Sequence, residues 1–206
     1  QKPTLVVGLS GGIGSGKSYV AGLLKDFGAQ VFDADRAGHD VLCDGEIKKL
    51  LRQRWGNQIF GSNGEVDRQE VAGIVFGCDE NAVTELRFLQ SISHPLIQDA
   101  LDEFIEKFQA AEDSVSIVVD AALLFEAGWD QWCDQVIFVD CRESVRWQRC
   151  RERGWSDEEI IQRQASQLEL QEKRRRSDLI LDNSGTRDNT REQLQAIWAV
   201  LTASVN

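Results

Sequence analysis

Five short apolar runs alternate along the chain with longer segments in which apolar residues recur every three or four positions. Their length and mainly apolar composition are typical of β-strands that are buried on both faces. These runs cover residues 4–9, 30–34, 115–120, 135–140 and 178–182.

The periodic segments carry helix signals. One face of the first predicted helix consists of Val20, Leu23, Leu24 and Phe27. Gly28 supplies the stop of this helix, and the same apolar spacing recurs over 194–201. Ser156 followed by Glu159 forms a capping box that opens another helix. The alternation of strands and helices predicts an α/β fold, a five-stranded parallel sheet with helices on both faces.

Residues 35–114, between the second and third runs, are more than a crossover between parallel strands requires. Segments such as IKKLLRQRW and RQEVAGIVF predict that this region is mostly helical. We expect the insertion to hold a second substrate. A purely structural extension is the alternative, and periodicity leaves it open.

Composition narrows the class of protein. The 206 residues carry a formal net charge of −11, which argues against nucleic-acid binding because phosphate backbones attract basic surfaces. No apolar stretch is long enough for a membrane span. Five cysteines, an odd number without a CxxC pair, indicate reduced thiols in a cytoplasmic protein.

The stretch VVGLSGGIGSGKSYV contains a phosphate-binding loop. Gly11, four further residues and then Gly16-Lys17-Ser18 match the P-loop pattern, between an apolar strand and an amphipathic helix. In such a loop backbone N–H groups surround phosphate, the lysine reaches the β- and γ-phosphates, and the hydroxyl is placed to ligate Mg²⁺. The expected ATP contacts are Gly12, Gly14, Ser15, Gly16, Lys17, Ser18 and Tyr19, with Ser18 as the magnesium ligand.

The remaining motifs favour a kinase among P-loop proteins. The chain has no NKxD element for guanine recognition. Asp33 and Asp35 lie at the end of the second strand, where carboxylates are able to accept a hydroxyl proton or orient Mg²⁺. On spacing alone, Asp35 fits equally well as the N-cap of a helix that begins at Arg36.

One face of the helix expected after the fourth strand carries four arginines: Arg142, Arg146, Arg149 and Arg153. As a group they favour anion binding in a lid over the ATP phosphates. The alternative is a solvated face paired with Glu143 and Glu152. The run EKRRRSD at 172–178 predicts a helix that closes this lid.

Taken in order, the motifs resemble the dephospho-coenzyme A kinase family over nearly the whole chain. They are GLSGGIGSGKS from residue 8, DAD at 33–35, SHPLI at 93–97, VDAALLFEAGWD at 119–130 and RERGWSDEEIIQRQASQLELQEKRRRSDLILDNSG at 151–185. The resemblance implies that ATP phosphorylates the ribose 3′-hydroxyl of dephospho-CoA, with Mg²⁺, to give CoA and ADP.

The resemblance also implies roles for individual residues. Asp35, with Asp33 beside it, is implied as the base or orienter for the 3′-hydroxyl, and Arg149 as the lid arginine at the transferring phosphoryl group. Lys17 and Ser18 keep their P-loop roles. The acceptor contacts implied are Asp35, His94, Leu123 and Glu126.

Several assignments stay open at this point. His94 is equally a packed or capping histidine before Pro95, and Glu126 fits either the magnesium side or the acceptor side. Asp120 and Asp140 both have the Walker B form, and spacing does not choose between them.

The chain departs from the family pattern at Tyr19, Ala122 and Ser177, where Thr, Pro and Ala are usual. None of these changes removes a group that the chemistry requires. There are two competing hypotheses. One is a P-loop kinase that phosphorylates the hydroxyl of another small molecule, and the other is a nucleotide-binding regulator that has lost catalysis.

We expect a nucleotide-binding core in 1–34, 115–141 and 177–206, a helical acceptor domain in 35–114 and a lid in 142–176. ATP and dephospho-CoA are the expected partners, without nucleic acid or membrane. The sequence leaves the oligomeric state open.

Overall fold

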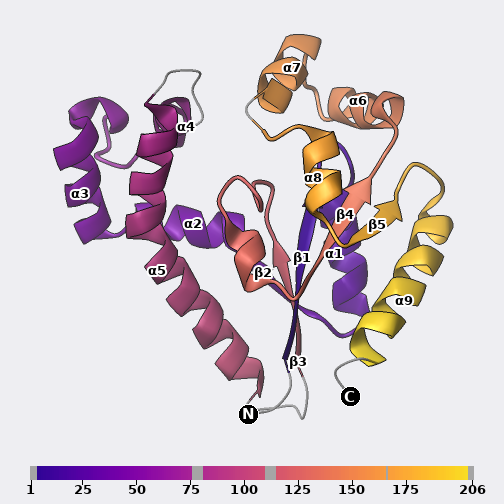
Figure 1. Cartoon of the computed structure of the whole chain (residues 1–206). Helices are drawn as coiled ribbons and strands as arrows, with labels where there is room; N and C mark the ends of the chain where they lie inside the picture. The colour runs from indigo at the N-terminus through magenta and orange to yellow at the C-terminus, as the bar shows by residue number, and fades with distance from the viewer. Residues whose placement is uncertain (1–3, 76–80, 110–114, 166, 204–206) are drawn as a thin grey trace. The chain divides into compact units, whose positions relative to one another are not determined.

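The computed structural model describes residues 4–75, 81–109, 115–165 and 167–203 (Figure 1). The chain divides into two compact units. The core unit comprises Gln1–Asp33 and Glu103–Asn206, and the helical unit comprises Ala34–Asp102. Cys78, one of the five cysteines of the sequence, lies outside the described residues. Among the described helices, none combines the length and the hydrophobicity needed to cross a bilayer.

The core unit is built on one parallel sheet, as the apolar runs predict. The strands are β1 Thr4–Gly11, β2 Gln30–Asp33, β3 Val115–Asp120, β4 Gln135–Asp140 and β5 Leu179–Asp182. Their order is β2-β3-β1-β4-β5, and every neighbouring pair is parallel. The central strand, β1, therefore delivers the glycine-rich loop to the middle of the carboxyl edge, where open α/β sheets bind ligands.

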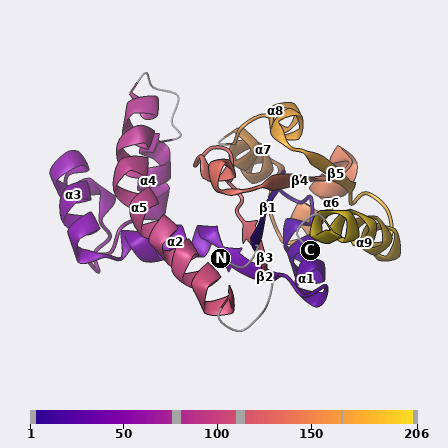
Figure 2. The same ribbon diagram turned by 60° about the horizontal axis from the view of Figure 1, so that its bottom comes forward.

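Helices α1, Lys17–Asp26, and α9, Arg187–Ala203, cover one face of the sheet. Figure 2 shows the two helices side by side. Their apolar stripes meet the strands in one core cluster, which includes Leu24 of α1, Leu194 and Trp198 of α9 and Val139 of β4. Burial of these stripes explains why both helices repeat apolar residues at three- and four-residue spacing.

Residues 142–176, the predicted lid, form α6, Glu143–Glu152, α7, Asp157–Ala165, and α8, Leu170–Arg176. The predicted capping box opens α7, because Ser156 N donates to Glu159 Oε2 at 2.8 Å and Glu159 N to Ser156 Oγ at 3.2 Å. Helix α8 contacts β1 and β4, so part of the predicted lid packs directly on the sheet.

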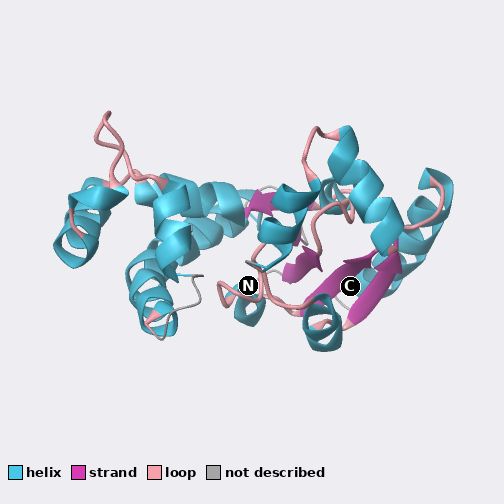
Figure 3. Ribbon diagram, turned by 90° about the horizontal axis from the view of Figure 1, so that it is seen from above, coloured by secondary structure: helices cyan, strands magenta, loops and turns pink. Residues whose placement is uncertain are grey.

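The helical unit contains no β-strand among its described residues, as Figure 3 shows. Its elements are α2 Ala34–Leu42, α3 Gly45–Trp55, the 3₁₀ turn Asn57–Ile59, α4 Arg68–Val75 and the greater part of α5 Ala82–Gln109. Asp44 caps α3 by accepting from Glu46 N at 2.8 Å and Ile47 N at 3.0 Å. The predicted helical character of 35–114 is thus seen in its described part.

Candidate active site

The loop between β1 and α1 needs its glycines for conformation and for packing. Gly14 and Gly16 have φ values of 73° and 90°, a region that residues with a side chain rarely adopt. A Cβ atom on Gly14 would lie 2.4 Å from the carbonyl oxygen of Arg146. One on Gly16 would lie 2.2 Å from Asn183 Nδ2. The loop therefore admits no larger residue at these two positions in this packing.

Side chains from α6 and from the end of β5 hold the carbonyl groups of the loop. Arg149 Nη1 donates to Ser15 O at 3.2 Å, and Arg149 Nη2 donates to Asn183 O at 3.0 Å. Asn183 Nδ2 donates to Ser15 O at 2.7 Å, and Asn183 Oδ1 accepts from Thr190 Oγ1 at 2.8 Å. The loop is thus fixed through its C=O groups, a preorganised arrangement that suits anion binding by its N–H groups.

Asn183 and Thr190 were missed as functional candidates. Both are buried, and Asn183 directly follows β5. The available signal was the Asn of DNSG after the last apolar run, because a polar residue that follows a buried strand requires hydrogen-bond partners.

Lys17 of the P-loop forms an ion pair with Asp120, the last residue of β3. Asp33, at the end of β2, is the register partner of Asp120. Asp140 instead pairs with Arg174 of α8. The structure therefore places Asp120, and not Asp140, beside the lysine of the P-loop, and a Walker B role for Asp120 stays a prediction.

The predicted arginine stripe consists of Arg142, Arg146, Arg149 and Arg153. In the described parts of the chain, none of them forms an ion pair with a carboxylate. Arg146 Nη1 instead donates to the P-loop carbonyl of Ile13 at 3.3 Å. Arg142 donates to Ser184 O at 3.3 Å. Arg146 and Arg149 thus contact the P-loop, whereas Arg142 and Arg153 are exposed to solvent, and anion binding by the stripe stays a prediction.

Glu126 lies in the loop after β3 and forms a buried ion pair with Lys173 of α8, with Nζ and Oε1 2.7 Å apart. Glu126 Oε1 also accepts from Leu168 N at 2.8 Å. Lys173 is 0 % exposed and donates to Ala122 O at 3.2 Å. Leu123, in the same loop, is half-buried. The ion pair of Glu126 and Lys173 links the loop after β3 to the predicted lid. A contact of Glu126 or Leu123 with the acceptor substrate stays a prediction.

Asp35 and His94 belong to the helical unit. Helix α2 begins at Ala34 and not at Arg36, so Asp35 lies within its first turn and the predicted N-cap position is wrong. His94 lies inside α5, which continues through Pro95, so it does not cap a helix. Their roles at the acceptor stay predictions.

Tyr19, the departure from Thr, packs against the start of α9. Its hydroxyl donates to Arg187 O at 3.3 Å, and the guanidinium of Arg187 lies 5.5 Å from the ring centroid. Ser18 is exposed in the first turn of α1. The described residues hold no group of three or more His, Cys, Asp or Glu placed to bind a metal. Mg²⁺ needs no such group, since it is often held by one or two protein oxygens together with substrate phosphates.

The described cysteines are free thiols. Burial raises the pKa of the Cys141 thiol, which donates to Asn183 O at 3.5 Å. Burial also raises the pKa of Cys133 to about 12, with Asp130, Asp134 and Asp178 nearby. These two cysteines stay protonated and serve as small packing side chains, Cys141 buried and Cys133 partly buried.

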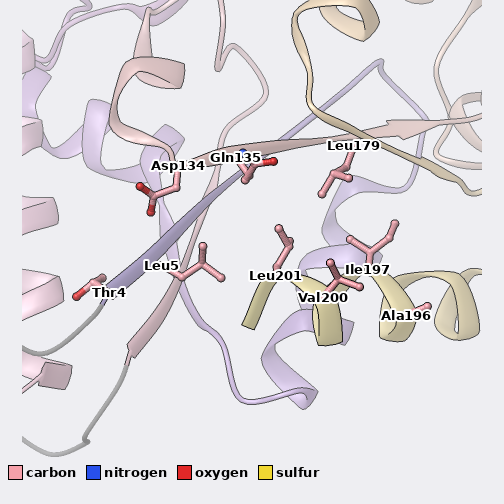
Figure 4. A pocket seen from close by; sticks show the side chains of 9 residues that line it. All are labelled: Thr4, Leu5, Asp134, Gln135, Leu179, Ala196, Ile197, Val200 and Leu201. Atoms are coloured by element: carbon pink, nitrogen blue, oxygen red, sulfur yellow. The ribbon is translucent and has the colours of Figure 1, made fainter. Parts of the chain in front are cut away.

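A cavity of about 730 Å³ lies away from this chemistry, at the amino ends of β1, β4 and β5 (Figure 4). Leu5, Leu179, Ile197 and Leu201 give it a largely apolar lining. Its one acidic side chain, Asp134, accepts from Val6 N at 2.8 Å. A second cavity, of about 590 Å³, touches the P-loop at Gly12 and Ile13. The second cavity is therefore the one placed to receive a phosphate-bearing ligand.

Comparison with known proteins agrees with this geometry. The family model of dephospho-CoA kinase matches residues 5–189. The chain belongs to the dephospho-CoA kinase family. As a member of that family it is a kinase, and its P-loop serves ATP-dependent phosphoryl transfer.

The dephospho-CoA kinase of Geobacillus kaustophilus is 37 % identical over 197 residues, which cover 94 % of this chain and 95 % of that protein. The dephospho-CoA kinase of Arabidopsis thaliana is 36 % identical over 194 residues, which cover 93 % and 82 %. The similarity thus spans the P-loop, the helical unit and the predicted lid.

Solved structures share the fold. A Thermus thermophilus protein has a TM-score of 0.78 and 29 % identity, with 98 % of this chain and 99 % of that chain covered. The dephospho-CoA kinase from Campylobacter jejuni has a TM-score of 0.63 at 21 % identity, with the same coverage. Both matches include the helical insertion as well as the sheet.

Proposed function

We propose that this chain transfers the γ-phosphoryl group of ATP to the ribose 3′-hydroxyl of dephospho-CoA, giving CoA and ADP, with Mg²⁺ bound to the nucleotide. The observation that carries the proposal is the pairing of Lys17 with Asp120 at the P-loop, in a chain of this family. A lysine and a carboxylate at the carboxyl edge of a parallel sheet are the parts that phosphoryl transfer requires.

The residues present fit a magnesium ion. Ser18 supplies a hydroxyl at the start of α1, and Asp120 supplies a carboxylate, and hard oxygen ligands suit Mg²⁺. The ion would neutralise charge on the phosphate oxygens when bound. Lys17 would bind and orient the phosphates, and the positive end of α1 would favour the same anion.

For the acceptor, Asp35 is proposed to accept the proton of the 3′-hydroxyl, with Asp33 orienting the group. Arg149 is proposed to stabilise the charge of the transferring phosphoryl group, from a position where it already contacts the P-loop carbonyl of Ser15.

The test is ADP release from MgATP with dephospho-CoA, and with adenosine and shikimate as alternative acceptors. We expect release only with dephospho-CoA, together with a new 3′-phosphate in the product. Equal release with adenosine or shikimate would overturn the acceptor assignment. Release with none of the three would leave a nucleotide-binding protein with another acceptor or a regulatory role.

The role of Asp35 is tested by Asp35→Ala, with Asp40→Ala as the matched control on α2. Asp40 is an exposed residue in a loose ion pair with Arg36, at 3.9 Å. We expect Asp35→Ala to retain ATP affinity and to lower kcat by at least about 10²-fold. A kcat within twofold of the unmodified protein would show that Asp35 is not the base.

A further inference from the structure

The cavity beside the P-loop is bounded entirely by the core unit. Gly12 and Ile13 form one wall, and α6, α7 and the start of α8 form the others. Its volume of about 590 Å³ is within the range of small-ligand sites. The chemistry of its walls therefore indicates what kind of ligand it would take.

Arg146 is the buried cation of this cavity. The residue is only 5 % exposed, and its Nη1 donates to Ile13 O at 3.3 Å. Its Nε is buried and has no hydrogen-bond acceptor among the described residues. No carboxylate of the described chain forms an ion pair with it. A buried charge without a counter-charge is costly, and an anionic ligand would remove that cost.

Two other cations of the predicted lid, Lys173 and Arg151, differ from Arg146 because each has a carboxylate partner. Lys173 is equally part of the predicted lid and is fully buried, yet it is paired with Glu126 at 2.7 Å. Arg151, five residues after Arg146 on α6, is exposed and is paired with Asp157 at 2.8 Å. The lid neutralises these cations internally, and it leaves Arg146 with a neutral carbonyl as its partner.

The loop is shaped to let this guanidinium come close. A Cβ atom on Gly12 would lie 3.2 Å from Arg146 Nη1 and 2.6 Å from Leu170 Cδ2. Glycine at this position therefore allows α6 and α8 to approach the P-loop. Glu143 and Glu169 also line the cavity, but both are exposed to solvent, which screens their charge.

We propose that this cavity is a phosphate subsite, in which Arg146 donates to a phosphate group of a bound substrate. A guanidinium presents planar, paired donors that match two phosphate oxygens. Both ATP and dephospho-CoA carry such groups, so the source is a matter for the experiment. The inference rests on the proposed function for the identity of these two substrates.

The experiment compares Arg146→Gln and Arg146→Lys with the matched control Arg151→Gln, which makes the same charge change on the same helix. KM for ATP and KM for dephospho-CoA are measured separately, with thermal unfolding as the check of folding. ATP affinity is also measured by calorimetry in the absence of acceptor. We expect Arg146→Gln to raise one KM by about tenfold or more, Arg146→Lys by about threefold, and Arg151→Gln by less than twofold.

A rise confined to ATP, with weakened ATP binding, would assign the subsite to the nucleotide. A rise confined to dephospho-CoA, with unchanged ATP binding, would assign it to the acceptor. Folded Arg146→Gln protein with both KM values and ATP affinity within twofold of the unmodified chain would overturn the proposal. If Arg146→Gln does not fold, unchanged values in Arg146→Lys would overturn it. If the unmodified chain does not phosphorylate dephospho-CoA, the proposed function fails, and the calorimetric comparison still decides the ATP side.

Discussion

Lys173 and Glu126 form an ion pair inside the protein, with Nζ and Oε1 2.7 Å apart and side-chain exposures of 0 % and 7 %. We predict that Lys173→Met lowers the free energy of unfolding by about 3–5 kcal/mol, because it leaves the carboxylate of Glu126 buried without its counter-charge. Chemical denaturation measures this loss. The double variant Lys173→Met, Glu126→Leu should recover most of it.

The control for this prediction is Lys49→Met, which breaks an exposed pair with Glu46. It should leave the unfolding midpoint unchanged. Equal effects of Lys173→Met and Lys49→Met would mean that the buried pair adds no more than a surface pair.

The two aspartates of Walker B form are predicted to behave differently. Asp120→Asn should lower kcat by about 10²-fold or more, because Asp120 pairs with Lys17, which is proposed to bind the phosphates. Asp140→Asn removes a half-exposed partner of Arg174 and should leave kcat within about twofold. Steady-state kinetics on the two variants make the comparison, and a larger loss in Asp140→Asn would reverse the assignment.

Thr190 is expected to support the P-loop through Asn183. Thr190→Val removes the buried donor to Asn183 Oδ1 and should cost about 1–2 kcal/mol of stability. We also expect a several-fold rise in KM for ATP, because Asn183 holds Ser15 O. Thr202→Val on the same helix is the control, since within the described part of the chain Thr202 donates only to carbonyls of its own helix. An unchanged KM for ATP in folded Thr190→Val protein would show that the hydrogen bonds from Thr190 through Asn183 to Ser15 do not contribute to nucleotide binding.

Thiol alkylation should separate the cysteines. With a pKa of about 12, Cys133 is almost entirely a thiol at pH 8, whereas Cys43 is exposed. Because the thiolate is the nucleophile, we predict that iodoacetamide modifies Cys43 at least about 100-fold faster than Cys133. Peptide mapping by mass spectrometry gives both rates, and comparable rates would contradict the raised pKa of Cys133.

Acid should weaken the helical unit through Glu85. Hydrogen bonds from Arg54 and Trp55 hold the pKa of Glu85 below its usual range. A carboxyl with a lowered folded pKa stabilises above its unfolded value near pH 4, and this contribution is lost as the pH falls through the folded value. Glu85→Gln should therefore cost about 1 kcal/mol at pH 7 and less at pH 3, as measured by denaturation at both values. An equal cost at both values would exclude this linkage.

The sheet and the P-loop could be predicted because their signals are local. Apolar runs mark the strands within two residues: β1 ends at Gly11 instead of residue 9, β2 ends at Asp33 instead of residue 34, and β5 begins at Leu179 instead of residue 178. The motif Gly11-x4-Gly16-Lys17-Ser18 specifies its own turn through its glycines.

Long-range pairings could not be predicted in this way. Lys173 stands among Arg174, Arg175 and Arg176, a run that reads as solvent-exposed, yet it is fully buried. Asn183 meets Ser15 across 168 positions of the chain. In both cases a partner distant in sequence decides the role of the side chain, and neither periodicity nor composition carries that information.

The register of β2 on β3 aligns Asp33 with Asp120. The apolar residues of these strands therefore fix the position of the two acids as well as filling the core. Phe32 is aligned with Val119, and Val31 with Val118, one and two steps before the acidic pair. Since successive side chains of a strand point to opposite faces, a slip of one residue would turn Asp33 away from its neighbour. The apolar residues of β2 and β3 therefore set the alignment of the two carboxylates through the strand register. A mutation that weakens this strand pairing would displace the carboxylates without changing either of them.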